Sequence, residues 1–140
     1  MILIDTNVIS EPLRPRPDPL VINWLRALPL GSGFLSAVSM AELLRGIAQL
    51  PDGKRKEGMA DDAEATLARL FAGRILPFEH SCARAYAQVC SEMRKNGRAI
   101  SALDAQIAAT ARVHHFIVAT RDIQPFKDAG LEVANPWADE

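Results

Sequence analysis

The sequence predicts an α/β domain, a three-layer α/β/α arrangement around a mainly parallel central sheet of about five short strands. Two observations predict this class: short, wholly apolar runs, and amphipathic segments of helical length between them. Such runs are typical of strands buried on both faces, and right-handed crossovers then place helices on both sides of the sheet. The 140 residues are enough for a single domain, 1–140, because a second core needs roughly 50 more residues.

The first half of the chain contains two expected strands and four expected helices. Residues 1–4 form the first apolar run, and a short helix beginning at Asp5 and Thr6 is closed off by prolines. Asp18 precedes a proline and caps a helix that runs to about residue 28. A brief strand at 34–35, a helix over 36–50 and a helix over 54–72 complete this half.

The second half continues the alternation. A strand over 74–78 precedes a helix over 80–95, which ends at an Asn-Gly pair. A helix over 101–114 leads into a buried strand at 116–119. After a turn at 120–122 and a short helix stopped by Gly130, residues 131–134 form the last strand.

Composition excludes several classes of protein. Hydrophobic residues make up 49% and charged residues 24%, which rules out a mainly disordered or collagen-like chain. The net charge of -1 excludes a strongly basic nucleic-acid binder, although a local basic patch stays possible. The chain has no apolar run of about 18 residues and no secretory signal. Cys82 and Cys90 lie eight positions apart on one expected helix, about 12 Å and too far for a disulfide, so we expect a cytoplasmic protein.

Four acids stand at unusual places along this pattern. Asp5 directly follows the first strand, and Asp122 lies just past the fourth. Glu42 is expected in the first turn of the helix after the second strand, and Asp104 in the first turn of the helix before the fourth. The first three are tied to carboxyl ends of strands, so sheet geometry brings them to one edge. Asp104 joins them if its helix begins at that edge.

Each acid also has a purely structural explanation. The two acids after strands can cap helices, and Ser39 with Glu42 and Ser101 with Asp104 have capping-box spacing. Together, however, four carboxylates repel: at about 5 Å and a dielectric near 20, each pair costs roughly 3 kcal/mol. A marginally stable fold does not gather such charges for stability. A hard divalent cation removes the repulsion, and Mg²⁺ and Mn²⁺ prefer oxygen ligands.

Other chemistries lack their motifs. The three histidines, His80, His114 and His115, are not spaced as metal ligands, and there is no HExxH or CxxC. Phosphate-binding GxxxxGK[ST] and GxGxxG loops and the GxSxG nucleophile elbow are also missing.

Four segments together resemble the acidic motifs of the PIN-domain ribonucleases: ILIDTNVIS, SAVSMAELLRG, SALDAQIAATA and VATRD. Their order and spacing are similar to those of the VapC-type toxins of toxin–antitoxin pairs, in particular the FitB-like branch, over nearly the whole chain. The resemblance implies a PIN-like fold and a catalytic metal pocket formed by four acids: Asp5, Glu42, Asp104 and Asp122. Of these, Asp5 and Asp104 are expected to be the most direct metal ligands. It also places three small polar residues around those ligands: Thr6, Asn7 and Thr120.

The reaction implied by this resemblance is hydrolysis of RNA phosphodiesters with one or two Mg²⁺ or Mn²⁺ ions. A water attacks phosphorus, and either Asp122 or Glu42 holds that water. Residues 84–121 carry a local excess of positive charge. Two explanations fit this charge: contacts with RNA phosphates, or ordinary helix faces exposed to solvent. The basic residues are Arg84, Arg94, Lys95, Arg98, Arg112 and Arg121, of which Arg121 is the first candidate for touching substrate.

The same resemblance implies a protein partner. A small antitoxin would place its C-terminal segment in a groove between the early helices and block the pocket. A homodimer or a toxin–antitoxin hetero-oligomer is expected, and no association with a membrane is expected. Six apolar residues are candidates for the groove, with core packing as the alternative: Trp24, Leu25, Leu28, Met59, Leu67 and Phe71.

Three rival functions remain at this stage. An aspartate-dependent phosphatase of the haloacid-dehalogenase type needs a second aspartate two positions after Asp5, where this chain has Asn7. A receiver-like phospho-switch needs an acidic pair in its first loop and a lysine after a late strand, and neither is found. A binding module whose acids only cap helices is the third. The four-part pattern favours the nuclease.

Overall fold

A computed structural model describes residues 1–138 and contains a five-stranded, wholly parallel sheet. The strand order is β3-β2-β1-β4-β5. The strands are short: β1 (Ile2–Ile4), β2 (Gly33–Ser36), β3 (Ile75–Leu76), β4 (Ile117–Ala119) and β5 (Val133–Ala134). Both the fold class and the five expected strands are confirmed.

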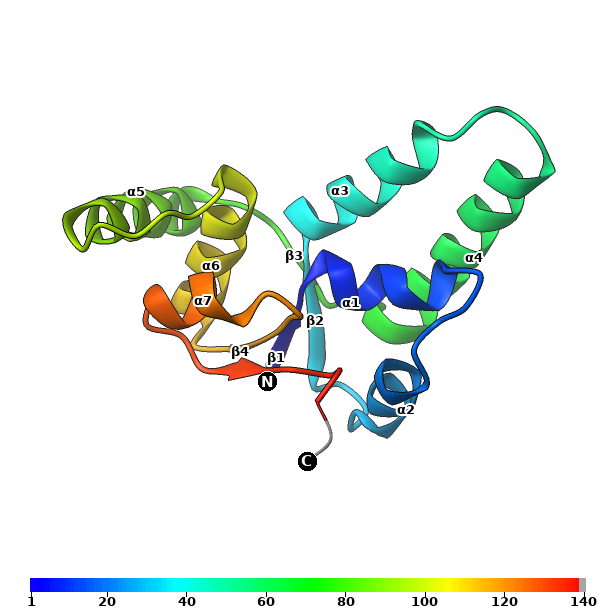
Figure 1. Cartoon of the computed structure of the whole chain (residues 1–140), viewed down its shortest axis with the longest axis horizontal. Coiled ribbons are helices and arrows are strands. Elements are labelled where there is room, and N and C mark those ends of the chain that lie inside the picture. Colours follow the sequence, from blue (N-terminus) through cyan, green and yellow to red (C-terminus); the bar gives the residue numbers. More distant parts are fainter. Residues whose placement is uncertain (139–140) are drawn as a thin grey trace.

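The helices lie in two layers on either side of this sheet (Figure 1). On one side are α5 (His80–Lys95), α6 (Ala102–His114) and α7 (Ile123–Asp128). On the other are α1 (Thr6–Ser10) with the 3₁₀ turn η1 (Glu11–Leu13), α2 (Pro19–Ala27), α3 (Ala37–Ala48) and α4 (Lys54–Phe71). Every expected helix is confirmed, and the ends differ from the expected ones by at most a few residues.

Two hydrophobic clusters fill the space between the sheet and its two helix layers. Leu3 belongs to the cluster with α5 and α6, and Ile4 belongs to the cluster with α1, α3 and α4. Both side chains are fully buried. Because successive side chains of a strand point to opposite faces, a strand covered on both sides must be apolar throughout, as β1 is.

The chain order reverses at β1, and this reversal positions the site. From β1 the chain goes outward to β2 and β3, and it then returns to β4 on the other side of β1. Ile4 and Ala119 are register partners at the carboxyl ends of β1 and β4. In open parallel sheets, ligands bind beyond the carboxyl ends at such a switch in strand order.

One local expectation was wrong. Helix α3 starts at Ala37, and its cap is Ser36, whose hydroxyl oxygen accepts from the Ser39 N–H at 2.9 Å. Glu42 therefore lies in the second helical turn and not in the first, and Ser39 is not the cap of a capping box. The capping explanation for Glu42 is removed, because its carboxylate is too far along the helix to reach the free N–H groups.

The two cysteines are on α5 as expected and form no disulfide. Within residues 1–138, no helix is long and apolar enough to span a membrane.

Candidate active site

Asp5 is the most buried of the four acids, with 4% of its surface exposed. It follows β1 directly and caps α1. Its Oδ1 accepts from the Thr6 N–H at 2.7 Å, and its Oδ2 accepts from the Thr120 hydroxyl at 2.7 Å. The carboxylate is therefore fixed by one group from its own helix and one from the end of β4.

Thr120 connects several parts of the site. Besides donating to Asp5, its hydroxyl oxygen accepts from the Asn7 side-chain amide at 3.2 Å and from the Asp122 N–H at 3.1 Å. Asn7 Oδ1 in turn accepts from the Arg121 N–H at 3.3 Å. Asn7 and Thr120, two of the three small polar residues that the resemblance placed around the acids, thus hold the loop after β1 against the turn after β4.

The remaining three acids come from three other segments. Glu42 is half-buried on α3, and Asp104 is the third residue of α6, which Ser101 caps by accepting from the Asp104 N–H at 3.1 Å. Asp122 immediately precedes α7 but makes no side-chain capping bond there. Asp104 could reach the sheet edge only if its helix began there, and the structure meets this condition.

A single cavity of about 320 Å³ is lined by all four carboxyl residues. The rest of its wall is mostly small and polar: Thr6, Asn7, Ser10 and Leu103. Four acids from four separate segments are therefore brought together at the carboxyl edge of the sheet.

The electrostatics of this cavity are unfavourable to the bare carboxylates. Burial raises the pKa of Asp5 from 3.8 to about 6, and the charges of Asp104 and Glu42 add to this rise against the hydrogen bonds from Thr120 and Thr6. The pKa of Asp104 is also raised, mainly by burial, with Asp122 and Glu42 contributing. The acids act on one another, and a cation among them lowers the free energy of their charged forms.

The donor set suits a hard divalent cation. Every acid supplies carboxylate oxygens, and the buried Thr6 hydroxyl on the cavity wall has no hydrogen-bond partner within the described residues. No three Asp, Glu, His or Cys side chains in residues 1–138 are close enough to form a ready-made ion site. The carboxylates thus line the cavity without meeting at one point. The residues fit an oxygen-liganded ion such as Mg²⁺ or Mn²⁺ that keeps some of its waters.

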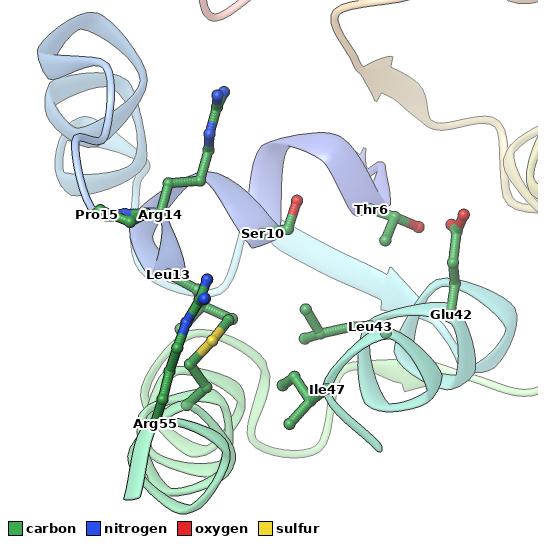
Figure 2. Close-up of a pocket in the computed structure, with 11 residues that line it drawn as sticks. Thr6, Ser10, Leu13, Arg14, Pro15, Glu42, Leu43, Ile47 and Arg55 are labelled. Atoms are coloured by element: carbon green, nitrogen blue, oxygen red, sulfur yellow. The ribbon is translucent and has the colours of Figure 1, made fainter. Parts of the chain in front are cut away.

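A larger groove of about 410 Å³ adjoins the acidic cavity and shares Thr6 and Glu42 with it. Figure 2 shows Thr6 and Glu42 at one end of this groove and Arg14 and Arg55 at the other. A third cavity, of about 430 Å³, shares Glu42 and includes Arg45. Sequence reasoning missed these three arginines, because they come from separate segments with no common motif.

The basic stretch expected to hold RNA is only partly available for it. Arg112 is paired with Glu92 at 2.9 Å, and Arg98 lies 3.9 Å from Asp128. Arg121 stacks on Trp137, with its guanidinium carbon 5.4 Å from the ring centroid. None of the six predicted basic residues is among those that line the acidic cavity.

The groove residues proposed from the sequence are mostly core residues. Leu25, Leu67 and Phe71 are buried in the hydrophobic cluster against α3 and α4, so this part of the prediction was wrong. Trp24 and Leu28 pack against the same cluster, and Met59 lines the groove.

Comparison with known proteins connects this geometry to a family. The PIN domain model matches residues 2–131. Toxin FitB of Neisseria gonorrhoeae is 50% identical over 99% of this chain and 100% of its own length. The VapC ribonuclease Y4jK of Sinorhizobium fredii is 43% identical over 98% of each chain. The crystal structure of FitAcB from Neisseria gonorrhoeae superposes with a TM-score of 0.94 at 49% identity, covering 99% of this chain and 100% of the matched one.

Proposed function

Since this chain belongs to the PIN-domain family, with a toxin and a VapC ribonuclease among its relatives, we propose that it is a metal-dependent ribonuclease and the toxin of a toxin–antitoxin pair. It hydrolyses RNA phosphodiester bonds. The observation that carries the proposal is that four carboxyl residues from four separate segments line one small cavity at the switch in strand order.

We assign one or two Mg²⁺ or Mn²⁺ ions to this cavity, with Asp5 and Asp104 as the most direct ligands and Glu42 and Asp122 completing the set. When bound, such an ion polarises the phosphate and lowers the pKa of a water. The bonds from Thr6 and Thr120 hold the Asp5 carboxylate in one orientation. Outer groups of this kind tune metal affinity.

Water is the nucleophile in this reaction. No Cys, His or Lys is among the described residues that line the cavity. Its two hydroxyls, of Thr6 and Ser10, are not hydrogen-bonded to a base that would activate them: Ser10 donates to the Asn7 carbonyl, and the Thr6 hydroxyl has no partner within the described residues. The carboxylates are therefore the bases, and either Glu42 or Asp122 holds the attacking water. Asp122 is available for this role because its side chain makes no capping bond.

The RNA phosphates next to the cleaved bond need cations. Arg121 is adjacent to Asp122 and is exposed, and Arg45 lines the cavity that shares Glu42. We assign the flanking phosphate contacts to these two arginines, since each adds a positive charge beside the acidic cavity.

The partner is a small antitoxin that closes the acidic cavity, and the chain forms a homodimer or a hetero-oligomer with that antitoxin. We place the complex in the cytoplasm, where its two free thiols stay reduced.

The test is RNA cleavage by the purified chain. The wild-type chain is expected to cleave RNA with Mg²⁺ or Mn²⁺ and to stop cleaving when EDTA is added. The cleavage rate is expected to fall at least about 100-fold in Asp5→Asn and in Asp104→Asn. Asp61→Asn and Asp62→Asn on the exposed face of α4 are the matched controls. Wild-type rates in both site variants contradict the assignment.

A further inference from the structure

The groove beside the acidic cavity has an apolar floor and a charge at each end. Its floor is formed by Leu13, Leu43, Ile47 and Met59. At one end are Glu42 and the acidic cavity, and at the other are Arg14 and Arg55 (Figure 2). A ligand that fills the whole groove must therefore be apolar in its middle and must satisfy opposite charges at its two ends.

A buried carboxylate holds the loop at the arginine end of the groove in place. Glu11, with 3% of its surface exposed, accepts from the Asp18 N–H through Oε1 at 2.8 Å and pairs with Arg14 through Oε2 at 3.2 Å. These bonds fix the loop that carries Arg14. Within the described residues, Arg55 has no carboxylate within 4 Å, so this end keeps a net positive charge after Glu11 is counted.

Gly46 contributes an open position to the groove wall. It lies inside α3, where glycine is less favourable than alanine. A Cβ on Gly46 would meet no atom within 4 Å, so the packing of this chain does not require a glycine there. Gly46 lines the groove, and its missing side chain leaves room for something outside the chain to approach the α3 backbone.

The lining favours a polypeptide over RNA. Single-stranded RNA sites use aromatic side chains on which bases stack, and none lines this groove. Aliphatic side chains around an open glycine suit the aliphatic side chain of a peptide. Thr6 and Arg14 are eight residues apart along α1 and η1, about 12–14 Å, which an extended peptide spans in about four residues.

We propose that Arg14 and Arg55 form a carboxylate-binding subsite, and Gly46 an aliphatic slot, that together select the antitoxin segment lying in this groove. The segment carries an Asp or Glu side chain at the arginine end and an aliphatic side chain over Gly46. Because the opposite end is acidic, this carboxylate fits only one end, which fixes the direction of the segment. This inference rests on the proposed function, since it specifies the antitoxin's chemistry.

The test measures the affinity of the full chain for the antitoxin encoded beside it, co-expressed, purified and titrated by calorimetry. Arg55→Glu is expected to weaken the complex about tenfold or more, and Lys54→Glu, the same charge change on the exposed neighbouring position, less than about threefold. Changing the matching antitoxin acid to Arg is expected to restore affinity to Arg55→Glu. Gly46→Leu is expected to weaken binding about tenfold or more, whereas Gly58→Leu, at an equally open helical glycine outside the groove, has little effect.

Three results would overturn the proposal in distinguishable ways. Wild-type affinity in Arg55→Glu removes the carboxylate subsite, and so does a loss of affinity that no reversal of an antitoxin acid restores. A rise in the KM for RNA of free Arg55→Glu that matches its loss of antitoxin affinity assigns the groove to RNA. If the wild-type chain cleaves RNA but binds no antitoxin, the toxin–antitoxin part of the proposed function fails, and the docking segment fails with it.

Discussion

The Thr120 hydroxyl donates a 2.7 Å hydrogen bond to the Oδ2 of Asp5, across 115 positions of sequence. The same oxygen accepts from the Asn7 amide and from the Asp122 N–H. One buried hydroxyl therefore joins the carboxylate after β1 to the backbone of the turn after β4. This arrangement fixes the Asp5 carboxylate while Asp122 stays free to face the cavity.

Replacing Thr120 with Val keeps the side-chain shape and removes these bonds. We expect Thr120→Val to lower the free energy of unfolding by about 1–3 kcal/mol and to slow cleavage about tenfold or more. Urea denaturation and single-turnover cleavage measure the two effects. Thr110→Val is the control, because the Thr110 hydroxyl donates only to the Gln106 carbonyl of its own helix. Cleavage at the wild-type rate by Thr120→Val contradicts the role given to this hydroxyl.

The raised pKa of Asp5 predicts a pH-dependent stability in metal-free protein. The folded chain holds this proton up to about pH 6, against 3.8 for an ordinary aspartate. The contribution of Asp5 to stability is thus complete below about pH 4 and is lost as the pH rises through 6, a change of about 3 kcal/mol. Relative to wild type, Asp5→Asn is expected to gain stability between pH 4 and pH 7. Urea titrations at several pH values test this, and a difference that stays constant with pH contradicts it.

Asp104→Asn removes one of the mutually repelling carboxylates. Without metal it is expected to melt no lower than wild type, and with Mg²⁺ to lose most of the metal-induced rise in Tm. Thermal melts with and without Mg²⁺ give both quantities, and Asp62→Asn is the control. An undiminished metal-induced rise in Asp104→Asn excludes Asp104 as a ligand.

Arg74 stabilises the fold away from the site. Its guanidinium donates to the carbonyls of Leu70 at 2.6 Å and of Gly33 at 3.0 Å, and so joins the end of α4 to β2. Arg74→Met keeps most of the side-chain length and is expected to lower the free energy of unfolding by about 2–3 kcal/mol. Cleavage per folded molecule is expected to be unchanged. Arg69→Met, at an exposed position of α4, is the control for loss of charge.

The elements that sequence predicts well here are those with a local cause. The apolar run of β1 and the Ser101 cap of α6 are determined by neighbouring residues in the sequence, and the structure contains both as expected. The wrong placement of Glu42 in the first turn of α3 has a local cause as well, since Ser36 and Ser39 are both acceptable caps and only the strand that ends at Ser36 decides between them.

The site was predictable only in part. Asp5 and Asp122 follow strands, so parallel-sheet geometry alone brings them near each other. The Thr120 bond, the exposed stacking of Arg121 on Trp137 and the arginines of the groove depend on segments far apart in sequence, and no spacing rule reveals them. Core and groove residues were confused for a physical reason: both are apolar positions on the inner faces of helices.

Binding of Mn²⁺ to the metal-free chain, followed by electron paramagnetic resonance and compared with the cleavage rate, tests the central claim most directly. If the four carboxylates hold the ion that drives cleavage, wild-type protein binds one or two Mn²⁺ per chain and cleavage appears over the same concentration range. Asp5→Asn and Asp104→Asn then lose both together. Unchanged Mn²⁺ binding in these variants, or full cleavage by wild-type protein that binds no Mn²⁺, contradicts the claim.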